Sequence, residues 1–122
     1  MSSIGFHEAE EHLGPATRDM HRAIVSLMEE LEAIDWYQQR VDATHDPELR
    51  EILGHNRDEE KEHASMVLEW IRRHDPKFDA NLREYLFQSG PIVGREQEVT
   101  NRNDSASGAA PGATVGSLRG SR

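Results

Sequence analysis

Three residues of this chain, Glu30, Glu60 and His63, combine the side-chain types and the spacing of metal ligands. Glu60 and His63 form a Glu-x-x-His pair, so one helical turn separates the carboxylate from the imidazole. Glu30 lies earlier, in a stretch that predicts a separate helix. One glutamate from one helix and a Glu-x-x-His pair from another are half of the ligand set of a di-iron four-helix bundle. Half a site in one chain predicts that two chains combine to complete it.

These side chains lie at positions where apolar residues are expected. At about 100° per residue, Glu30 shares a helix face with Leu27 and Ile34. Glu60 and His63 interrupt the apolar face of the second helix in the same way. An unpaired buried carboxylate costs several kcal/mol, so such a group must be paired, protonated or metal-bound. A divalent cation would satisfy all three side chains. An arginine partner for Glu30 and a carbonyl partner for His63 are the alternatives.

The ligand types restrict the metal. The chain has no cysteine, which excludes a thiolate site. Doubling the three ligands across a two-fold axis gives four carboxylates and two imidazoles, enough for two metal ions with open positions. Carboxylates with one imidazole per metal favour iron or manganese over a closed zinc site.

A second group of side chains lies on the opposite face of the first helix. Glu29, Glu32 and Trp36 are three and four residues apart and therefore form one strip. An exposed tryptophan predicts a protein contact, and the two glutamates would attract cations. A solvated acidic strip is the alternative. Tyr37 borders the metal-binding face, either as a residue that acts beside the metal or as an ordinary packed tyrosine.

Two long helices must position these groups. The apolar spacing predicts helices over residues 15–41 and 47–73, with Asp46 as the N-cap of the second. A short third helix is predicted over residues 79–87. The apolar faces expected on the two long helices consist of Met20, Ala23, Ile24, Leu27, Leu31, Ile34 and Val41 on the first and of Leu49, Ile52, Leu53, Val67, Trp70 and Ile71 on the second. The short helix is expected to bury Leu82, Tyr85 and Leu86.

Composition sets the class of protein. The 122 residues carry a formal charge of −9, and residues 1–93 contain 20 acids against 10 Lys and Arg. An acidic body argues against nucleic acid as a partner. No stretch approaches the ~20 apolar residues of a membrane span, and the N-terminus lacks a secretory signal. With 35% hydrophobic residues a single hairpin buries little, so self-association is expected.

We therefore predict an all-α domain over residues 1–93, in which residues 1–14 are a solvated end and ordered structure ends at Gly90-Pro91. Residues 94–122 are rich in Gly, Ser, Ala and Asn and predict a flexible tail.

Longer blocks of the sequence resemble the encapsulated ferritin family, over about residues 18–93. The matching blocks are 21–26, 28–33, 35–37, 56–64, 68–73 and 85–87. The resemblance implies a two-helix antiparallel hairpin plus a short C-terminal helix, which dimerises into a ferritin-like four-helix bundle with a di-iron centre. It also implies an annular decamer inside an encapsulin nanocompartment in the bacterial cytoplasm.

Matched positions imply roles for single residues. The ferroxidase ligands would be Glu30, Glu60 and His63, and the tyrosine beside the centre would be Tyr37. The residues where metal enters would be Glu29, Glu32 and Trp36, with calcium as a second candidate ion there.

The tail resembles an encapsulin-targeting peptide at about residues 112–120. Val115 and Leu118 would fill small pockets on the shell wall, and the Gly-Ser background would provide reach. Where such tails often carry Leu before the Thr-Val pair, this chain has Ala113, which predicts weaker docking.

The predicted function is a ferroxidase that oxidises Fe(II) to Fe(III) with dioxygen for iron storage in an encapsulin shell. One alternative is a peroxide-handling bundle enzyme with iron or manganese at the same ligands. The other is a non-enzymatic helical cargo or scaffold protein, in which arginines would pair with the acids of the metal-binding face.

Overall fold

The computed structural model describes residues 5–95, and the regular secondary structure in this range is helical. A short 3-10 helix, η1 (Glu10–His12), precedes α1 (Pro15–Ala43), α2 (Pro47–His74) and α3 (Pro76–Tyr85). The chain divides into two compact units, one ending at His74 and one beginning at Asp75. The predicted targeting peptide at about residues 112–120 lies outside the described residues. None of the described helices is long and apolar enough to cross a membrane.

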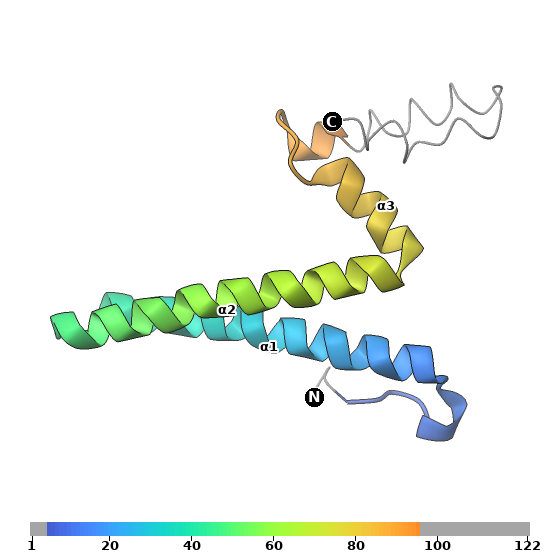
Figure 1. The fold of residues 1–122 in the computed structure, drawn as a ribbon, viewed down its shortest axis with the longest axis horizontal. Helices are drawn as coiled ribbons and strands as arrows, with labels where there is room; N and C mark the ends of the chain where they lie inside the picture. Colours follow the sequence, from blue (N-terminus) through green and yellow to red (C-terminus); the bar gives the residue numbers. More distant parts are fainter. Residues whose placement is uncertain (1–4, 96–122) are drawn as a thin grey trace. The chain divides into compact units, whose positions relative to one another are not determined.

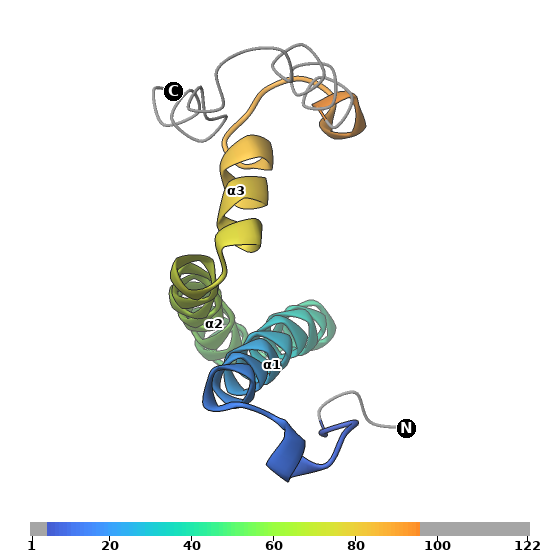
Figure 2. The ribbon, with the colours of Figure 1, turned by 90° about the vertical axis from the view of Figure 1, so that its right-hand side faces the viewer.

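The first unit is built around an antiparallel pair of long helices, which confirms the predicted hairpin. In Figures 1 and 2, α1 and α2 lie side by side with their chain directions opposed. Gly14 is the N-cap of α1 and Pro15 takes its first position, where a missing N–H costs nothing. No glycine or proline interrupts α1 after Pro15, so the helix continues for 29 residues.

Local hydrogen bonds define the turn between the two helices. The Asp46 carboxylate accepts from the backbone N–H groups of Glu48 at 2.9 Å and Leu49 at 3.2 Å. Asp46 is therefore the N-cap of α2, as predicted. The Arg50 guanidinium donates to the carbonyl of Thr44 at 2.6 Å and closes the turn from the other side.

The contact between α1 and α2 is thin, because two helices can cover only one face of each other. Among the described hydrophobic residues only Ala64 and Ile71 are buried, both on α2. The face predicted for α1 is half-buried, with Ile24 and Leu31 at its edge more exposed. Leu49 and Ile52, which the sequence places on the apolar face of α2, are exposed in a single chain.

The second unit begins with α3, which starts three residues before the predicted position. The Asp75 carboxylate accepts from the backbone N–H of Phe78 at 2.9 Å, so Asp75 caps the helix and Pro76 takes its first position. The sequence predicts a start at Asp79, because the Asp75-Pro76 pair can end one helix as well as begin the next. The helix ends at Tyr85, and Leu86, predicted to be buried, is exposed.

Ordered structure continues past Gly90-Pro91, where the sequence predicted its end. Phe87 and Gly90 have positive φ angles of 60° and 90°, and they reverse the chain so that residues 92–95 form a further helical turn. The Arg95 side chain binds Glu84 of α3: Nη2 lies 2.9 Å from a carboxylate oxygen and Nε donates to the Glu84 carbonyl at 3.1 Å.

The N-terminal segment also contacts a helix, which the sequence did not predict. The Phe6 ring lies 4.6 Å from the His21 ring, centroid to centroid. Arg18 of α1 pairs with Glu10 of η1 at 3.6 Å. The segment preceding α1 is therefore held against that helix.

Candidate metal centre

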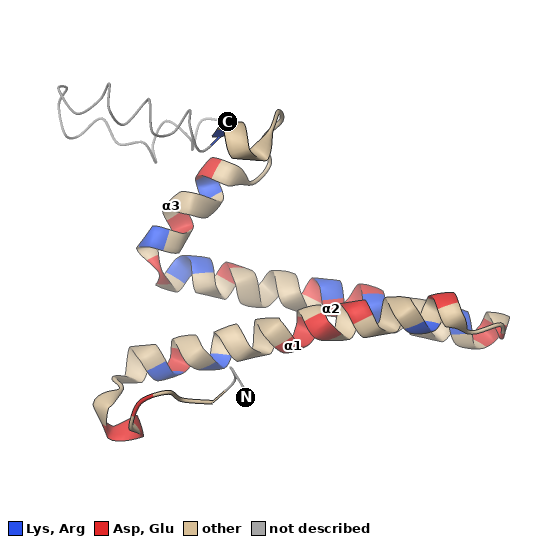
Figure 3. Ribbon diagram, turned by 180° about the vertical axis from the view of Figure 1, so that it is seen from behind, with Lys and Arg blue, Asp and Glu red and all other residues tan. Residues whose placement is uncertain are grey.

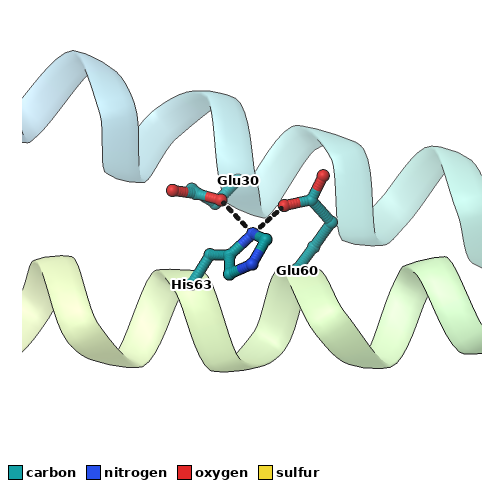
Figure 4. A group of neighbouring side chains, drawn as sticks. All are labelled: Glu30, Glu60 and His63. Atoms are coloured by element: carbon teal, nitrogen blue, oxygen red, sulfur yellow. Dashed lines mark hydrogen bonds and ion pairs between the residues drawn. The ribbon is translucent and has the colours of Figure 1, made fainter.

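Glu30, Glu60 and His63 meet between α1 and α2. One ligand atom from each lies within 4.8 Å of the others. Figure 4 shows Glu30 extending from α1 toward Glu60 and His63 on the facing side of α2. His63 Nδ1 lies 3.0 Å from a Glu60 oxygen and 3.6 Å from a Glu30 oxygen. The facing of the two helices, which the sequence could only infer, thus places these side chains together.

Helix geometry explains why these three side chains lie together. Glu60 and His63 are one turn apart on α2, so both project from the same face. The antiparallel arrangement of α1 brings Glu30 opposite them. Figure 3 shows acidic residues of both helices near the middle of the hairpin, where the two ribbons meet, and others toward its ends.

The three side chains are partly withdrawn from water. The side chains of Glu30, Glu60 and His63 are 18%, 26% and 47% exposed. Burial, followed by a hydrogen bond shared with Glu60, raises the pKa of the Glu30 carboxyl. The pKa of the His63 imidazole is raised first by its hydrogen bond to Glu60 and further by the negative charge of both glutamates. Protons are therefore held more tightly here than in water.

Neither carboxylate forms an ion pair with an arginine or a lysine within residues 5–95. A scaffold protein with acids on this face was predicted to neutralise them with arginine. The described contacts instead leave the two acids with one imidazole, which carries at most one positive charge. The cluster therefore has a deficit of positive charge that a divalent cation could fill.

A polar link beside the cluster was missed by the sequence interpretation. Arg57 of α2 donates from Nη1 to Oε1 of Gln38 on α1 at 2.8 Å. The register that pairs Glu30 with His63 also predicts this contact, because antiparallel helices pair later residues of α1 with earlier residues of α2. Arg57 was noted only as part of a resembling block.

The other predicted site residues are not part of the three-residue cluster. Glu29, Glu32 and Trp36 lie on the exposed surface of α1, and 48% of Trp36 is accessible. Within the described residues, Glu29 and Glu32 form no ion pair, and Trp36 has no aromatic partner. Tyr37 is half-buried, and the Arg40 guanidinium lies 5.3 Å from its ring centroid. The roles predicted for these four residues stay predictions.

The donor set fits a hard or borderline divalent metal ion. Two carboxylates and one imidazole suit iron or manganese, and the chain offers no thiolate that would favour a structural zinc. Three protein ligands are fewer than the six positions of an octahedral ion, so water, substrate or ligands from another chain would complete it.

Comparisons with known proteins converge on one family. The sequence model of the EncFtn-like family matches residues 5–89. The chain is 56% identical over 127 residues to the encapsulated ferritin-like protein of Rhodospirillum rubrum, covering 98% of this chain and 91% of the relative. It is 34% identical over 104 residues to the encapsulin nanocompartment cargo protein EncC of Myxococcus xanthus, covering 78% and 80%.

A solved structure has a similar fold. The crystal structure of protein ne0167 from Nitrosomonas europaea matches with a TM-score of 0.70 and 64% sequence identity, covering 72% of this chain and 97% of that one. At this identity the likeness extends beyond backbone topology to most side chains.

Proposed function

This chain belongs to the EncFtn-like family, and from that premise we propose that it is a ferroxidase, which oxidises Fe(II) to Fe(III) with dioxygen. The reaction takes place at a di-iron centre shared between two protomers. Each protomer contributes Glu30, Glu60 and His63, and the Fe(III) product is stored as mineral within an encapsulin shell.

The cluster of three ligand atoms within 4.8 Å is the observation that carries this proposal. Two carboxylates without an arginine or lysine partner in the described chain attract a cation. Carboxylate ligands favour Fe(III) over Fe(II) because they are hard and negatively charged. Two Fe(II) ions held by the paired ligand sets would supply two electrons, one each, which reduces one dioxygen to the level of peroxide as both ions become Fe(III).

The surface of the hairpin supports a shared centre. Large apolar side chains stay exposed on both helices of a single chain, and a soluble monomer rarely leaves so many uncovered. They are Ile24, Met28 and Leu31 on α1 and Leu49, Ile52 and Met66 on α2. A second copy packed against this hairpin would cover apolar surface and bring a second set of ligands. We propose this dimer as the functional unit and an annular decamer as its assembly.

The acidic strip on α1 is the proposed route of Fe(II) to the centre. Glu29 and Glu32 are exposed carboxylates close in sequence to Glu30, and Trp36 lies on the same strip. Negative charge at an approach raises the local concentration of cations. The strip would hold Fe(II) or calcium weakly, and Tyr37 would act beside the centre.

The proposed partner is an encapsulin shell protein, which makes this chain a cargo protein in the bacterial cytoplasm. The Myxococcus relative carries such a name, and residues 112–120 resemble a targeting peptide. Deleting residues 112–122 should abolish co-purification with a co-expressed shell while leaving iron oxidation intact. Unchanged co-purification would exclude the tail as the docking segment.

Iron oxidation tests the proposed activity directly. The protein is loaded with Fe(II) in the absence of oxygen and then exposed to air, and the rise in absorbance of the Fe(III) product is followed with time. Wild type should develop absorbance much faster than buffer, and His63→Ala should not. His45→Ala removes an exposed imidazole in the hairpin turn and serves as the matched control, with the wild-type rate expected.

Two results would decide against the proposal. Equal rates for wild type and buffer would exclude a ferroxidase. A manganese-dependent loss of hydrogen peroxide without iron-dependent oxygen consumption would favour the alternative peroxide-handling enzyme.

A further inference from the structure

A chain of hydrogen bonds crosses from α2 to α1 about two helical turns from the contact between His63 and Glu30. Arg57 Nη1 donates to Gln38 Oε1 at 2.8 Å, and Gln38 Nε2 donates to Asp42 Oδ1 at 3.0 Å. Arg57 Nε donates to Asp58 Oδ1 at 2.9 Å. The Arg57 side chain is 22% exposed, so most of it is held against the hairpin. The link thus joins the two helices that supply the ligands.

The link and the cluster belong to one register of the hairpin. Gln38 lies eight residues after Glu30 on α1, which is about 12 Å along the helix. Arg57 lies six residues before His63 on α2, which is about 9 Å in the same direction. A slip of one helical turn, about 5.4 Å, would break both the 2.8 Å link and the 3.6 Å contact between His63 and Glu30.

Apolar packing alone specifies this register weakly. From Asp58 to Glu62 the second helix is entirely charged, so this stretch offers no apolar side chain to pack against α1. The two buried hydrophobic residues of the described chain, Ala64 and Ile71, lie on the far side of His63 from Arg57. A specific polar contact at a helix interface fixes register where apolar packing does not.

The link does not depend on the groups that bind metal. The contacts of His63 with Glu30 and Glu60 use the atoms that a metal ion would take, so they are exchanged on binding. The atoms of Arg57, Gln38 and Asp42 are not needed as ligands. Asp58 and, through Gln38, Asp42 offset the positive charge of Arg57 beside a cation site.

We propose that Arg57 is a positioning residue, which through Gln38 holds α1 and α2 in the register that presents Glu30 to Glu60 and His63. The inference rests on the proposed function, since it takes these three side chains as the metal ligands. Arg57 itself touches neither metal nor dioxygen. A purely electrostatic role for its charge is the competing explanation.

Binding of cobalt(II) tests the register of α1 and α2 without requiring catalytic turnover. Visible absorbance titrations of the full chain compare wild type with Arg57→Met, Gln38→Leu and the double variant. Each single variant should weaken cobalt binding about tenfold, as loss of an outer partner typically does. The double variant should be no worse than either single one, because both remove one interaction. Gln38→Glu, which keeps an acceptor for the guanidinium, should restore binding to within about twofold.

Lys61→Met is the matched control for charge. Lys61 is on the same helix, is largely exposed and also contacts Asp58, but it does not reach Gln38. The Lys61→Met variant should bind cobalt with the wild-type affinity. A loss for Lys61→Met equal to that for Arg57→Met, or wild-type binding for Gln38→Leu, would overturn the positioning role in favour of charge. Circular dichroism of each variant separates weakened binding from unfolding.

Iron oxidation by the same variants distinguishes the two proposals. If wild type oxidises iron and all variants match it in rate and in cobalt affinity, the positioning role is wrong and the ferroxidase stands. If cobalt affinity depends on Arg57 and Gln38 while wild type oxidises no iron, the positioning role stands and the ferroxidase is wrong.

Discussion

Glu84 in α3 and Glu30 in α1 are both carboxylates withdrawn from water, but their surroundings differ. The Glu84 side chain is 3% exposed and is paired with Arg95, whose guanidinium contacts both the carboxylate and the backbone carbonyl of Glu84. The Glu30 side chain is less buried, with 18% of its surface exposed. Within the described chain its one cationic neighbour is the His63 imidazole, which also contacts Glu60. Burial alone therefore does not distinguish a carboxylate with a fixed cationic partner from one without it.

The two carboxylates differ in the group that supplies the compensating positive charge. A carboxylate paired with a fixed guanidinium is complete, and breaking the pair costs stability. A carboxylate near another carboxylate and an imidazole must bind a proton or a metal ion, which is why the pKa of Glu30 is raised by burial and by Glu60. The complete pair supports structure, and the incomplete cluster is suited to exchange of cations.

The largest expected effect is on the rate of iron oxidation, which should depend on Glu30 and not on Glu84. Glu30→Gln should lower the initial rate of ferric absorbance by more than about a hundredfold, since a ligand should matter more than its outer partners. Glu84→Gln, an equal change in charge and size, should keep the rate of the folded protein within about threefold. If Glu84→Gln lost as much activity as Glu30→Gln, the distinction between the two acids would fail.

The second-largest expected effect is a loss of stability when the ion pair between Glu84 and Arg95 is broken. Glu84→Leu leaves the Arg95 guanidinium without its carboxylate, which should cost about 3 kcal/mol, the low end for a broken buried pair because Arg95 keeps some contact with water. Amide hydrogen exchange over residues 86–95 should accelerate about a hundredfold. Adding Arg95→Met should restore most protection, since two apolar groups replace the pair. Equal exchange in Glu84→Leu and wild type would show that the pair does not hold this segment.

The hairpin topology and the meeting of Glu30, Glu60 and His63 were predictable because helical periodicity determines which residues share a face. Glu30, Glu60 and His63 stood out as polar residues on apolar faces, and their meeting required only that those faces pack. Glu84 did not stand out. Its partner Arg95 lies beyond two residues with positive φ, and a chain reversal of this kind leaves no periodic pattern.

The exposure of Leu49 and Ile52 was not predictable from one chain for a different reason. Helical spacing identifies an apolar face but does not say whether the same chain or a second copy covers it. The start of α3 was missed because Asp75-Pro76 is both a helix break and a helix beginning, and only the bond to Phe78 distinguishes them.

A pH series should affect the cluster and leave the Glu84 pair unchanged. Metal needs a neutral imidazole, and the pKa of His63 is raised, chiefly by its hydrogen bond to Glu60. Cobalt affinity should therefore fall as pH drops through that raised pKa, by up to about tenfold per pH unit for one released proton. Amide hydrogen exchange over residues 86–95 should stay constant with pH, once the intrinsic pH dependence of amide exchange is corrected for.

Stability of the metal-free protein should show the opposite trend. A raised folded-state pKa gives a contribution that is complete below the unfolded value of about 6.5 and is lost as pH rises through the folded value. Urea unfolding with a chelator should show this loss in wild type and in His45→Gln, but not in His63→Gln. A His63→Gln series with the wild-type slope would assign the pH dependence to another group.

The smallest effect concerns the opposite end of the helix that carries Glu84. The Asp75 carboxylate caps α3 through the Phe78 N–H at 2.9 Å, so Asp75→Ala should cost about 1 kcal/mol. Asp75→Ser keeps a capping oxygen and should recover most of that loss. Hydrogen exchange of the first turn of α3 measures both, and cobalt affinity should not change in either variant. A larger loss for Asp75→Ala than for Glu84→Leu would mean that the cap, and not the buried ion pair, is the main polar support of the second unit.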